Sequence, residues 1–187
     1  MKKLLLVIAV ALVTLPSAAS AYRFEGGRWP TSAIGYYNES PAAAWSVDTA
    51  AQAWSTSGAN VRFVKVPRGR ADVLIGVRWE KTAGDADIQR FAGRFANARV
   101  GIQTGQDRYT TALVVAHELG HVLGLDHETR GCATMNPTIV DDHMINCPEP
   151  PDGMWTCRLV QPDDVRGVVT LYGGNVRPWR GSPFCRR

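Results

Sequence analysis

The stretch that decides the fold reads His117-Glu-Leu-Gly-His-Val-Leu-Gly-Leu-Asp-His127, and Met135 follows eight positions later. It contains three of the four histidines in the chain. Side chains four residues apart on an α-helix project from one face, so His117 and His121 would lie one turn apart on the same side. Two imidazoles placed in this way can bind one zinc ion. The stretch therefore predicts a helix that presents a pair of metal ligands.

Glu118 and Gly124 fit the same interpretation. Glu118 lies one position further round the helix, beside the metal but outside its ligand set, where it can act as general base for a bound water. Gly124 can adopt the left-handed conformation that ends a helix, and the turn would bring His127 back as a third ligand. Three protein ligands leave one position open, which is typical of catalytic zinc. The alternative, a helix with ordinary solvated or core histidines, does not account for this register.

The N-terminus has the pattern of a signal peptide. Met1-Lys2-Lys3 is a short positive start, Leu4 to Leu15 is an apolar run, and Ala19-Ser20-Ala21 is a small-x-small cleavage site. A membrane anchor would need about 20 apolar residues, and this run is too short. We therefore expect residues 1–21 to be removed, residues 22–187 to form one secreted domain, and no membrane association after cleavage.

Charge and cysteine content suit such a domain. Removing residues 1–21 takes away two lysines and no acidic residue, which leaves 19 basic against 17 acidic residues. This small excess does not indicate nucleic-acid binding, and we expect a monomer. The four cysteines all follow residue 127 and predict two disulfides in an exported protein. Three pairings are open, of which we prefer Cys132–Cys147 with Cys157–Cys185.

The remaining pattern predicts an α+β fold: a twisted mixed sheet, an active-site helix and a second helix beneath it, and a small irregular C-terminal lobe ending in a helix. The expected strands are 34–37, 61–66, 72–79 and a short polar one at 99–104. The expected helices are one ending near Gly58, one over 109–124 with Thr110 or Thr111 near its N-cap, and one from Pro162 to Gly173. Residues 80–98 are expected to form a flexible loop.

The whole set of motifs resembles the metzincin zinc peptidases, and within them the matrixins, the matrix-metalloprotease type of catalytic domain. The resemblance rests on His117 to His127, on Met135 in Cys132-Ala-Thr-Met-Asn-Pro137, and on the closing segment from Gln161 to Gly173. It covers essentially the whole mature chain and implies a compact, secreted, bacterial member. Asn136 and Thr138 stand where the family usually has aromatic residues around the Met-turn proline.

The resemblance also implies the roles of other residues. Met135 would form a hydrophobic floor under the zinc, whereas His143 would be a surface or pocket-rim residue. Strand 99–104, with Val100, Gly101 and Ile102, would be the sheet edge to which an extended peptide adds. The substrate pocket would be walled by Val114, the His117 ring and residues from Pro137 to Asn146. One catalytic zinc is expected and no second zinc. The second zinc is not expected because the glycine- and aspartate-rich stretch that holds structural zinc and calcium in animal matrixins has no counterpart between Glu80 and Arg99; calcium stays open.

Two further expectations concern the mature N-terminus and restraint of activity. In matrixins the freed ammonium of an aromatic first residue pairs with an aspartate of the closing helix, and here Tyr22 and Asp163-Asp164 stand at the corresponding places. The alternative is that the two aspartates only favour the helix N-terminus electrostatically. No pro-domain with a cysteine switch is visible, so latency of the usual kind is not expected.

The leading function is a secreted zinc endopeptidase acting on protein or peptide substrates, with Glu118 accepting a proton from the attacking water and passing it to the departing amine. One alternative is a zinc-binding module without peptidase activity that acts in adhesion or inhibition. The intact Glu118 argues against it, because an idle site has no use for that base. Another alternative is a cell-wall peptide hydrolase, although no wall-binding repeat is visible.

Overall fold

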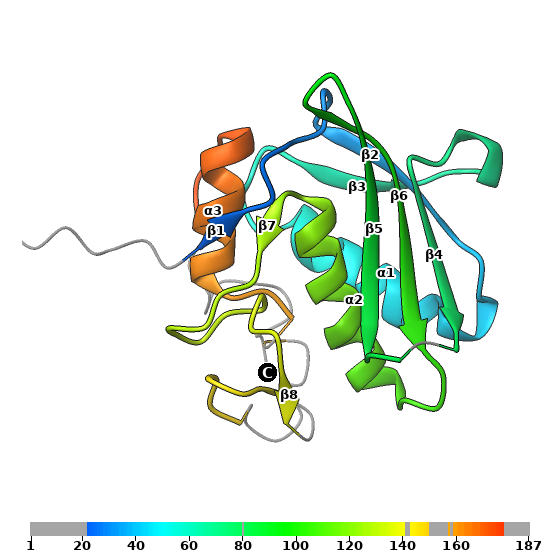
Figure 1. Cartoon of the computed structure of the whole chain (residues 1–187), viewed down its shortest axis with the longest axis vertical. Helices are drawn as coiled ribbons and strands as arrows, with labels where there is room; N and C mark the ends of the chain where they lie inside the picture. Colours follow the sequence, from blue (N-terminus) through cyan, green and yellow to red (C-terminus); the bar gives the residue numbers. More distant parts are fainter. Residues whose placement is uncertain (1–21, 80, 141–142, 150–156, 158, 178–187) are drawn as a thin grey trace, which may run out of the picture.

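The chain folds around a five-stranded mixed sheet with two helices on one face (Figure 1). The computed structural model describes residues 22–79, 81–140, 143–149, 157 and 159–177. The expected signal peptide, residues 1–21, and Cys185 of the second expected disulfide lie outside these ranges. The strands are β1 (Arg23–Phe24), β2 (Ala33–Asn38), β3 (Arg62–Lys65), β4 (Val73–Arg78), β5 (Gly84–Phe91), β6 (Arg94–Gln103), β7 (Leu125–Asp126), β8 (Ile139–Val140) and β9 (His143–Met144). The α-helices are α1 (Ala44–Ser55), α2 (Arg108–Val122) and α3 (Pro162–Tyr172), and short 3-10 turns occur at Pro41–Ala43 and Arg68–Arg70.

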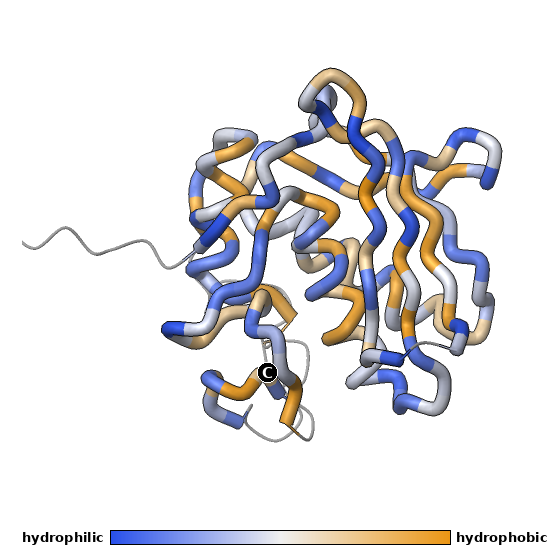
Figure 2. The backbone as a smooth tube through the Cα atoms, viewed as in Figure 1, coloured by the Kyte–Doolittle hydropathy of each residue, from blue (hydrophilic) through white to orange (hydrophobic). Residues whose placement is uncertain are grey.

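The sheet has the order β3-β2-β4-β6-β5, with β5 antiparallel to β6 and the other neighbours parallel. The parallel strands are connected by crossovers, and α1 is the crossover between β2 and β3. Apolar residues of the inner strands point to the helical face, and Ile34, Val73 and Val100 are fully buried. Hydropathy alternates along much of β6, whereas β4 (Val-Leu-Ile-Gly-Val-Arg) is apolar along most of its length (Figure 2). The predicted α+β class with a mixed sheet is confirmed.

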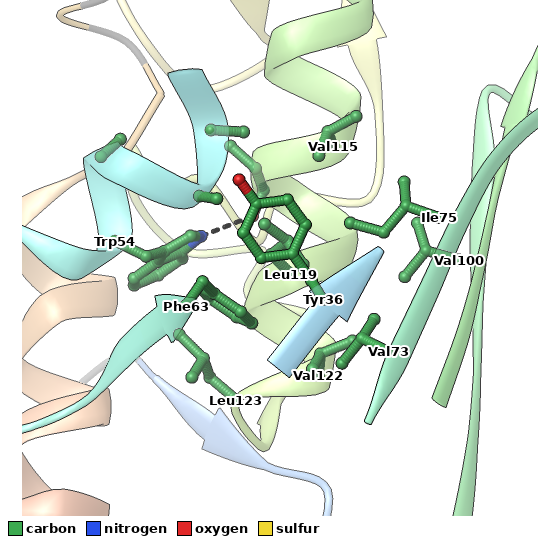
Figure 3. Close-up of a cluster of buried hydrophobic side chains, with 14 of the residues drawn as sticks. Tyr36, Trp54, Phe63, Val73, Ile75, Val100, Val115, Leu119, Val122 and Leu123 are labelled. Carbon is green, nitrogen blue, oxygen red and sulfur yellow. Dashed lines mark hydrogen bonds between the residues drawn. The ribbon is translucent and has the colours of Figure 1, made fainter. Parts of the chain in front are cut away.

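The core forms where α1 and α2 meet the sheet (Figure 3). Trp54 of α1 is fully buried, and its indole nitrogen donates a hydrogen bond of 2.8 Å to the carbonyl of Ala116 in α2. Trp29, which precedes β2, donates similarly at 2.7 Å to the carbonyl of Val122 near the end of α2. A buried indole needs a partner for its N–H, and both tryptophans find it on the same helix. The two bonds fix α2 along its length against the rest of the core.

The N-terminus of α2 differs from the prediction. The helix is capped by Asp107, whose carboxylate accepts hydrogen bonds from the backbone N–H groups of Tyr109 (2.7 Å) and Thr110 (3.2 Å). A carboxylate that satisfies two free N–H groups is a better cap than a threonine hydroxyl. The predicted cap at Thr110 or Thr111 was therefore wrong by one turn.

The sheet edge also differs from the prediction. Residues 80–98 were expected to form a loop, but residues 84–91 form β5 and residues 94–103 form β6. The predicted edge strand at Val100, Gly101 and Ile102 is instead an inner strand between β4 and β5, and these three residues are buried. The free edge belongs to β5. Its sequence, Gly-Asp-Ala-Asp-Ile-Gln-Arg-Phe, gives only a weak strand signal. Ala86 and Ile88 alternate with polar residues, but they are its only inward apolar residues and both are only partly buried.

The other elements agree with the sequence analysis. Helix α3 begins with Pro162 in its first turn and ends at Gly173, which has a φ of 76°. The described residues between His127 and α3 are mostly irregular, apart from the short β8–β9 pair. Within the described ranges, no helix has the length and apolar character needed to span a bilayer.

The indole bond from α1 to α2 leads to a stability prediction. Trp54→Phe should lower the free energy of unfolding by about 1–3 kcal/mol, because the change leaves the aromatic ring in place but removes a buried donor. Trp79→Phe is the matched control: Trp79 is 83% exposed, so the free energy should change by less than about 0.5 kcal/mol. Urea denaturation followed by far-UV circular dichroism measures both. Equal effects of the two changes would contradict the assigned role of Trp54.

Candidate metal centre

Three histidine side chains converge at the end of α2. His117 and His121 project from one face of the helix, and the turn after it returns His127 to the same place. The Nε2 atom of His117 lies 3.2 Å from that of His121 and 3.3 Å from that of His127. Two nitrogen ligands at about 2.0–2.1 Å from a tetrahedral zinc are separated by about 3.3–3.4 Å. The predicted ligand set is thus brought together at the spacing that zinc requires.

The opposite ring nitrogens fix the tautomer of both helical histidines. His117 Nδ1 lies 2.7 Å from the backbone carbonyl of Thr134, and His121 Nδ1 lies 2.8 Å from that of Leu125. A carbonyl can only accept, so each Nδ1 carries the proton and each Nε2 presents its lone pair to the cluster. Burial, and secondarily the neighbouring His121, lowers the pKa of His117 to about 3. Burial also lowers the pKa of His121. Both rings are therefore neutral at physiological pH, the form that ligates metal.

The turn that places His127 depends on Gly124. This residue has a φ of 102°, and a Cβ added to it would lie 2.7 Å from the backbone oxygen of Gly27. Only glycine fits these two constraints. After the turn, β7 pairs antiparallel with β1, and the backbone N–H of Glu25 donates to the carbonyl of Gly124 at 2.9 Å. The N-terminal segment thus holds the turn from outside.

Met135 packs beneath the histidines, as predicted for a hydrophobic floor. It is 1% exposed, and its sulfur lies so close to Gly120 that a Cβ on this glycine would overlap it. The same hypothetical Cβ would lie 3.3 Å from the Trp54 ring. The glycine between the two histidine ligands therefore provides the space in which the turn around Met135 contacts α2.

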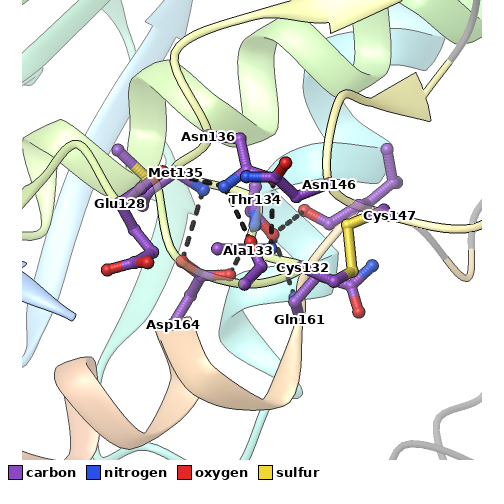
Figure 4. Close-up of a disulfide and its surroundings, with 12 residues drawn as sticks. Glu128, Cys132, Ala133, Thr134, Met135, Asn136, Asn146, Cys147, Gln161 and Asp164 are labelled. Carbon is purple, nitrogen blue, oxygen red and sulfur yellow. Dashed lines mark hydrogen bonds between the residues drawn. A yellow bond between two sulfur atoms is a disulfide. The ribbon is translucent and has the colours of Figure 1, made fainter. Parts of the chain in front are cut away.

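The turn itself is held by α3 (Figure 4). Asp164 is 1% exposed, and its carboxylate accepts hydrogen bonds from the backbone N–H groups of Thr134 (2.6 Å) and Met135 (3.3 Å). Burial raises the pKa of Asp164 to about 7, while the two N–H donors act in the opposite direction. Because the carbonyl of Thr134 accepts from His117, the carboxylate positions a metal ligand through one residue. Sequence analysis related Asp164 only to the N-terminus or the helix dipole and missed this contact.

Two other features stabilise the lobe after His127. The predicted disulfide Cys132–Cys147 is present, with a Cα–Cα distance of 4.4 Å. The side-chain amide of Asn136 is fully buried and donates to the carbonyls of Glu128 (2.8 Å) and Gly131 (2.9 Å). The residue that departs from the family's aromatic pattern thus holds the loop by hydrogen bonds. His143 lies outside the histidine cluster, in β9.

Glu118 lies in the same cleft as the histidines and is 5% exposed. Burial raises the pKa of its carboxyl to about 8, and the Asp85 carboxylate adds to the increase. A divalent cation on the adjacent histidines acts in the opposite sense, because it favours the ionised carboxylate. The site therefore places a carboxyl group with a perturbed pKa beside a potential metal, as expected of a proton carrier.

The cleft has a volume of about 410 Å³ and lies between β5, α2 and the lobe after His127. Val114 and Pro137 line it, as the sequence predicted. Val100, Gly101 and Ile102 do not, because β5 covers this side. The lining residues that sequence analysis missed are Glu25, Thr82, Ala83, Gly84, Asp85, Ala86 and Asp126. Apart from Asp126, which stands in the His117–His127 stretch, none of them belongs to a recognisable motif. The β5 residues were missed because their segment was expected to be a loop.

Comparison with known proteins adds independent information. The profile of the family described as Matrixin matches residues 79–173, which include α2, the histidine cluster and α3. Human matrix metalloproteinase-20 is 32% identical over 143 residues, which are 68% of this chain and 27% of that protein. Human stromelysin-3 is 32% identical, over 63% of this chain and 24% of that protein. Rabbit (Oryctolagus cuniculus) macrophage metalloelastase is 29% identical, over 70% of this chain and 29% of that protein. The chain thus spans less than a third of the length of these relatives.

The close approach of Met135 to α2 leads to a second prediction. Gly120→Ala should destabilise the fold by about 1–3 kcal/mol, because the new methyl group overpacks the contact with the sulfur. Gly131→Ala is the control, in the lobe that also contains Met135, since a Cβ there meets nothing within 4 Å. Chemical denaturation of the zinc-free proteins measures both. If Gly120→Ala is as stable as Gly131→Ala, the floor is not packed as described.

Proposed function

The chain belongs to the matrixin family, and we propose that it is a secreted zinc endopeptidase in which Glu118 carries the proton. Matrixins use a catalytic zinc, and His117, His121 and His127 can hold it. The observation that carries the proposal is the convergence of three Nε2 atoms at zinc spacing in a cleft that also contains a buried carboxyl group. A structural zinc would be closed by a fourth protein ligand, and no fourth ligand joins this cluster among the described residues.

The chemistry divides between metal and protein. A bound zinc supplies Lewis acidity, which makes a water molecule more acidic and polarises a peptide carbonyl. Glu118 accepts a proton from the attacking water and returns it to the amine that leaves. Its burial between β5 and α2 keeps bulk water away from that exchange. Thr134 and Leu125 keep the helical histidines in the tautomer that ligates.

The substrate would bind along β5, which has a free edge beside the cleft. An extended peptide can add there as a further strand, with backbone hydrogen bonds giving affinity. Its side chain next to the cut bond would enter the space lined by Val114, Pro137 and Ile139. This assignment replaces the strand at 99–104, which is paired on both sides. Binding by backbone contacts suits protein and peptide substrates rather than one small molecule.

The mature N-terminus would form an ion pair with α3. The Tyr22 hydroxyl lies 3.1 Å from Thr170 Oγ1, and a Cβ added to Gly167 would lie 3.1 Å from the Tyr22 ring. One face of α3 carries Asp163, Gly167 and Thr170. The side chain of Tyr22 contacts the last two of these, so we expect its backbone nitrogen to be directed toward Asp163. Asp163 Oδ2 is buried and has no hydrogen-bond partner among the described residues. Cleavage before Tyr22 would supply an ammonium for this oxygen.

The role of Glu118 is tested by Glu118→Gln. The variant should retain one zinc per chain but lose about 10²–10⁴-fold in hydrolysis, because the amide cannot accept the proton. Glu39→Gln, which breaks a surface ion pair with Arg68, is the control and should leave both unchanged. Metal analysis and cleavage of a proteome-derived peptide library, with and without chelator, give the readouts. A wild-type protein that holds zinc but cuts nothing would favour a binding module.

The role of the N-terminus is tested by one added residue. A chain beginning with alanine before Tyr22 should lose activity by about fivefold, the equivalent of about 1 kcal/mol for a partly buried ion pair, while it stays folded and keeps its zinc. Asp163→Asn should give the same loss in the mature chain and no further loss in the extended one. Unchanged activity of the extended chain would refute the ion pair.

A further inference from the structure

A second carboxylate, outside the matched motif, lies against the metal cluster. Glu25 follows β1 and lines the cleft with the histidines. Its Oε1 atom is 3.5 Å from Nδ1 of His121, the nitrogen that also faces the carbonyl of Leu125 at 2.8 Å. This nitrogen donates its hydrogen bond to the carbonyl of Leu125, and the carboxylate of Glu25 lies beside it at ion-pair distance. The Nδ1 atom of the other helical ligand, His117, is hydrogen-bonded to the carbonyl of Thr134.

Glu25 is itself held on both sides of its backbone. Its N–H donates to the carbonyl of Gly124 at 2.9 Å, and its carbonyl accepts from the guanidinium of Arg90 at 3.2 Å. The same guanidinium is 3.0 Å from Oε2 of the side chain. Both contacts come from Nη2, so one nitrogen of Arg90 is hydrogen-bonded to the backbone carbonyl and to the carboxylate of Glu25. Oε1 is left to face the imidazole.

Arg90 is directed to this place by two features of the β5–β6 hairpin. The pairing register shifts between Gln89 and Arg90, and such irregularities change the direction of side chains. The guanidinium carbon also lies 5.3 Å from the centre of the Phe95 ring, at the distance of a cation–π interaction. The contacts from Arg90 to Glu25 and from Glu25 to His121 thus connect β5 to the metal cluster.

Asp126 does not share this role, although it also lines the cleft. Its Oδ1 accepts from the backbone N–H of His127 at 2.7 Å, and its Oδ2 lies 3.9 Å from Arg23. Neither of these contacts reaches an imidazole, although the charge of Asp126 also acts on His121 and, against the larger lowering by burial, raises its pKa. Glu25 is the one of these two carboxylates that lies within 4 Å of the His121 ring nitrogen.

We propose that Glu25, oriented by Arg90, is a positioning residue for the zinc ligand His121. A carboxylate hydrogen-bonded to the far nitrogen of a ligand histidine fixes the ring and strengthens its donor atom, and loss of such a partner typically weakens metal binding by about 10–100-fold. The inference rests on the proposed function, because it assigns a role at the same metal site.

Zinc affinity of the purified mature protein tests the inference. Titration against a chromogenic chelator should show about 10–100-fold weaker zinc binding for Glu25→Gln. Glu39→Gln is closely matched, because Glu39 is 27% exposed against 30% for Glu25 and both pair with an arginine at about 3 Å. It should bind zinc like the wild type. The absorption spectrum of the cobalt-substituted protein should change only for Glu25→Gln.

A second variant tests whether Arg90 acts on His121 through Glu25. Arg90→Met keeps the aliphatic stem over Phe95 but removes the guanidinium, so zinc binding should weaken less than in Glu25→Gln. In the double variant, zinc binding should equal that of Glu25→Gln, because Arg90 acts through Glu25. Additive losses would overturn this order.

Other outcomes separate the inference from the proposed function. Unchanged zinc affinity in Glu25→Gln overturns the inference whatever the activity, and a raised KM with unchanged affinity would make Glu25 a substrate contact instead. A wild-type protein that binds zinc without hydrolysing peptides overturns the proposed function but leaves the affinity comparison valid.

Discussion

The structure depends on holding three imidazole nitrogens together. The Nε2 atoms of the cluster lie 3.2–3.3 Å apart along two of its sides. Lone pairs that face one another at such distances repel, and a cation bound between them relieves the repulsion. The protein must supply that geometry before the cation arrives. It does so through backbone carbonyls behind the rings, a glycine turn and a packed methionine, and each of these is held by a further element.

Those further elements come from distant parts of the chain. α1 and the segment before β2 fix α2 through two indole N–H groups. α3 fixes the turn at Thr134 through Asp164. β1 fixes the turn at Gly124 by strand pairing. The sheet contributes its edge strand, which forms one wall of the cleft. Elements from across the described chain thus fix the C-terminal end of α2 and the turns that follow it.

Much of this arrangement could be predicted from the sequence, and the rest could not for definable reasons. The helix ligands, the turn at Gly124 and the closing helix at Pro162 follow from spacing and from residues with strong local preferences, whereas the role of Met135 came from the family resemblance. β5 was missed because its only inward apolar residues, Ala86 and Ile88, make a short and weak alternation, and the strand after it was then taken for the edge. Glu25, Arg90 and Asp164 act through contacts between segments far apart in sequence, and no local pattern reports such contacts.

The long span of these supports bears on when the site can exist. Tyr22 and Arg28 contact α3 at separations of 148 and 143 residues, and Asp164 reaches back 30 residues to Thr134. A chain whose C-terminal part has not yet emerged lacks α3, so the turn behind His117 has no anchor. Contacts of this sequence range form late, because the intervening chain must be ordered first. Formation of the metal cluster is thereby timed to the arrival of α3, which must first pack against the segment at Tyr22 and Arg28 and against the turn at Thr134.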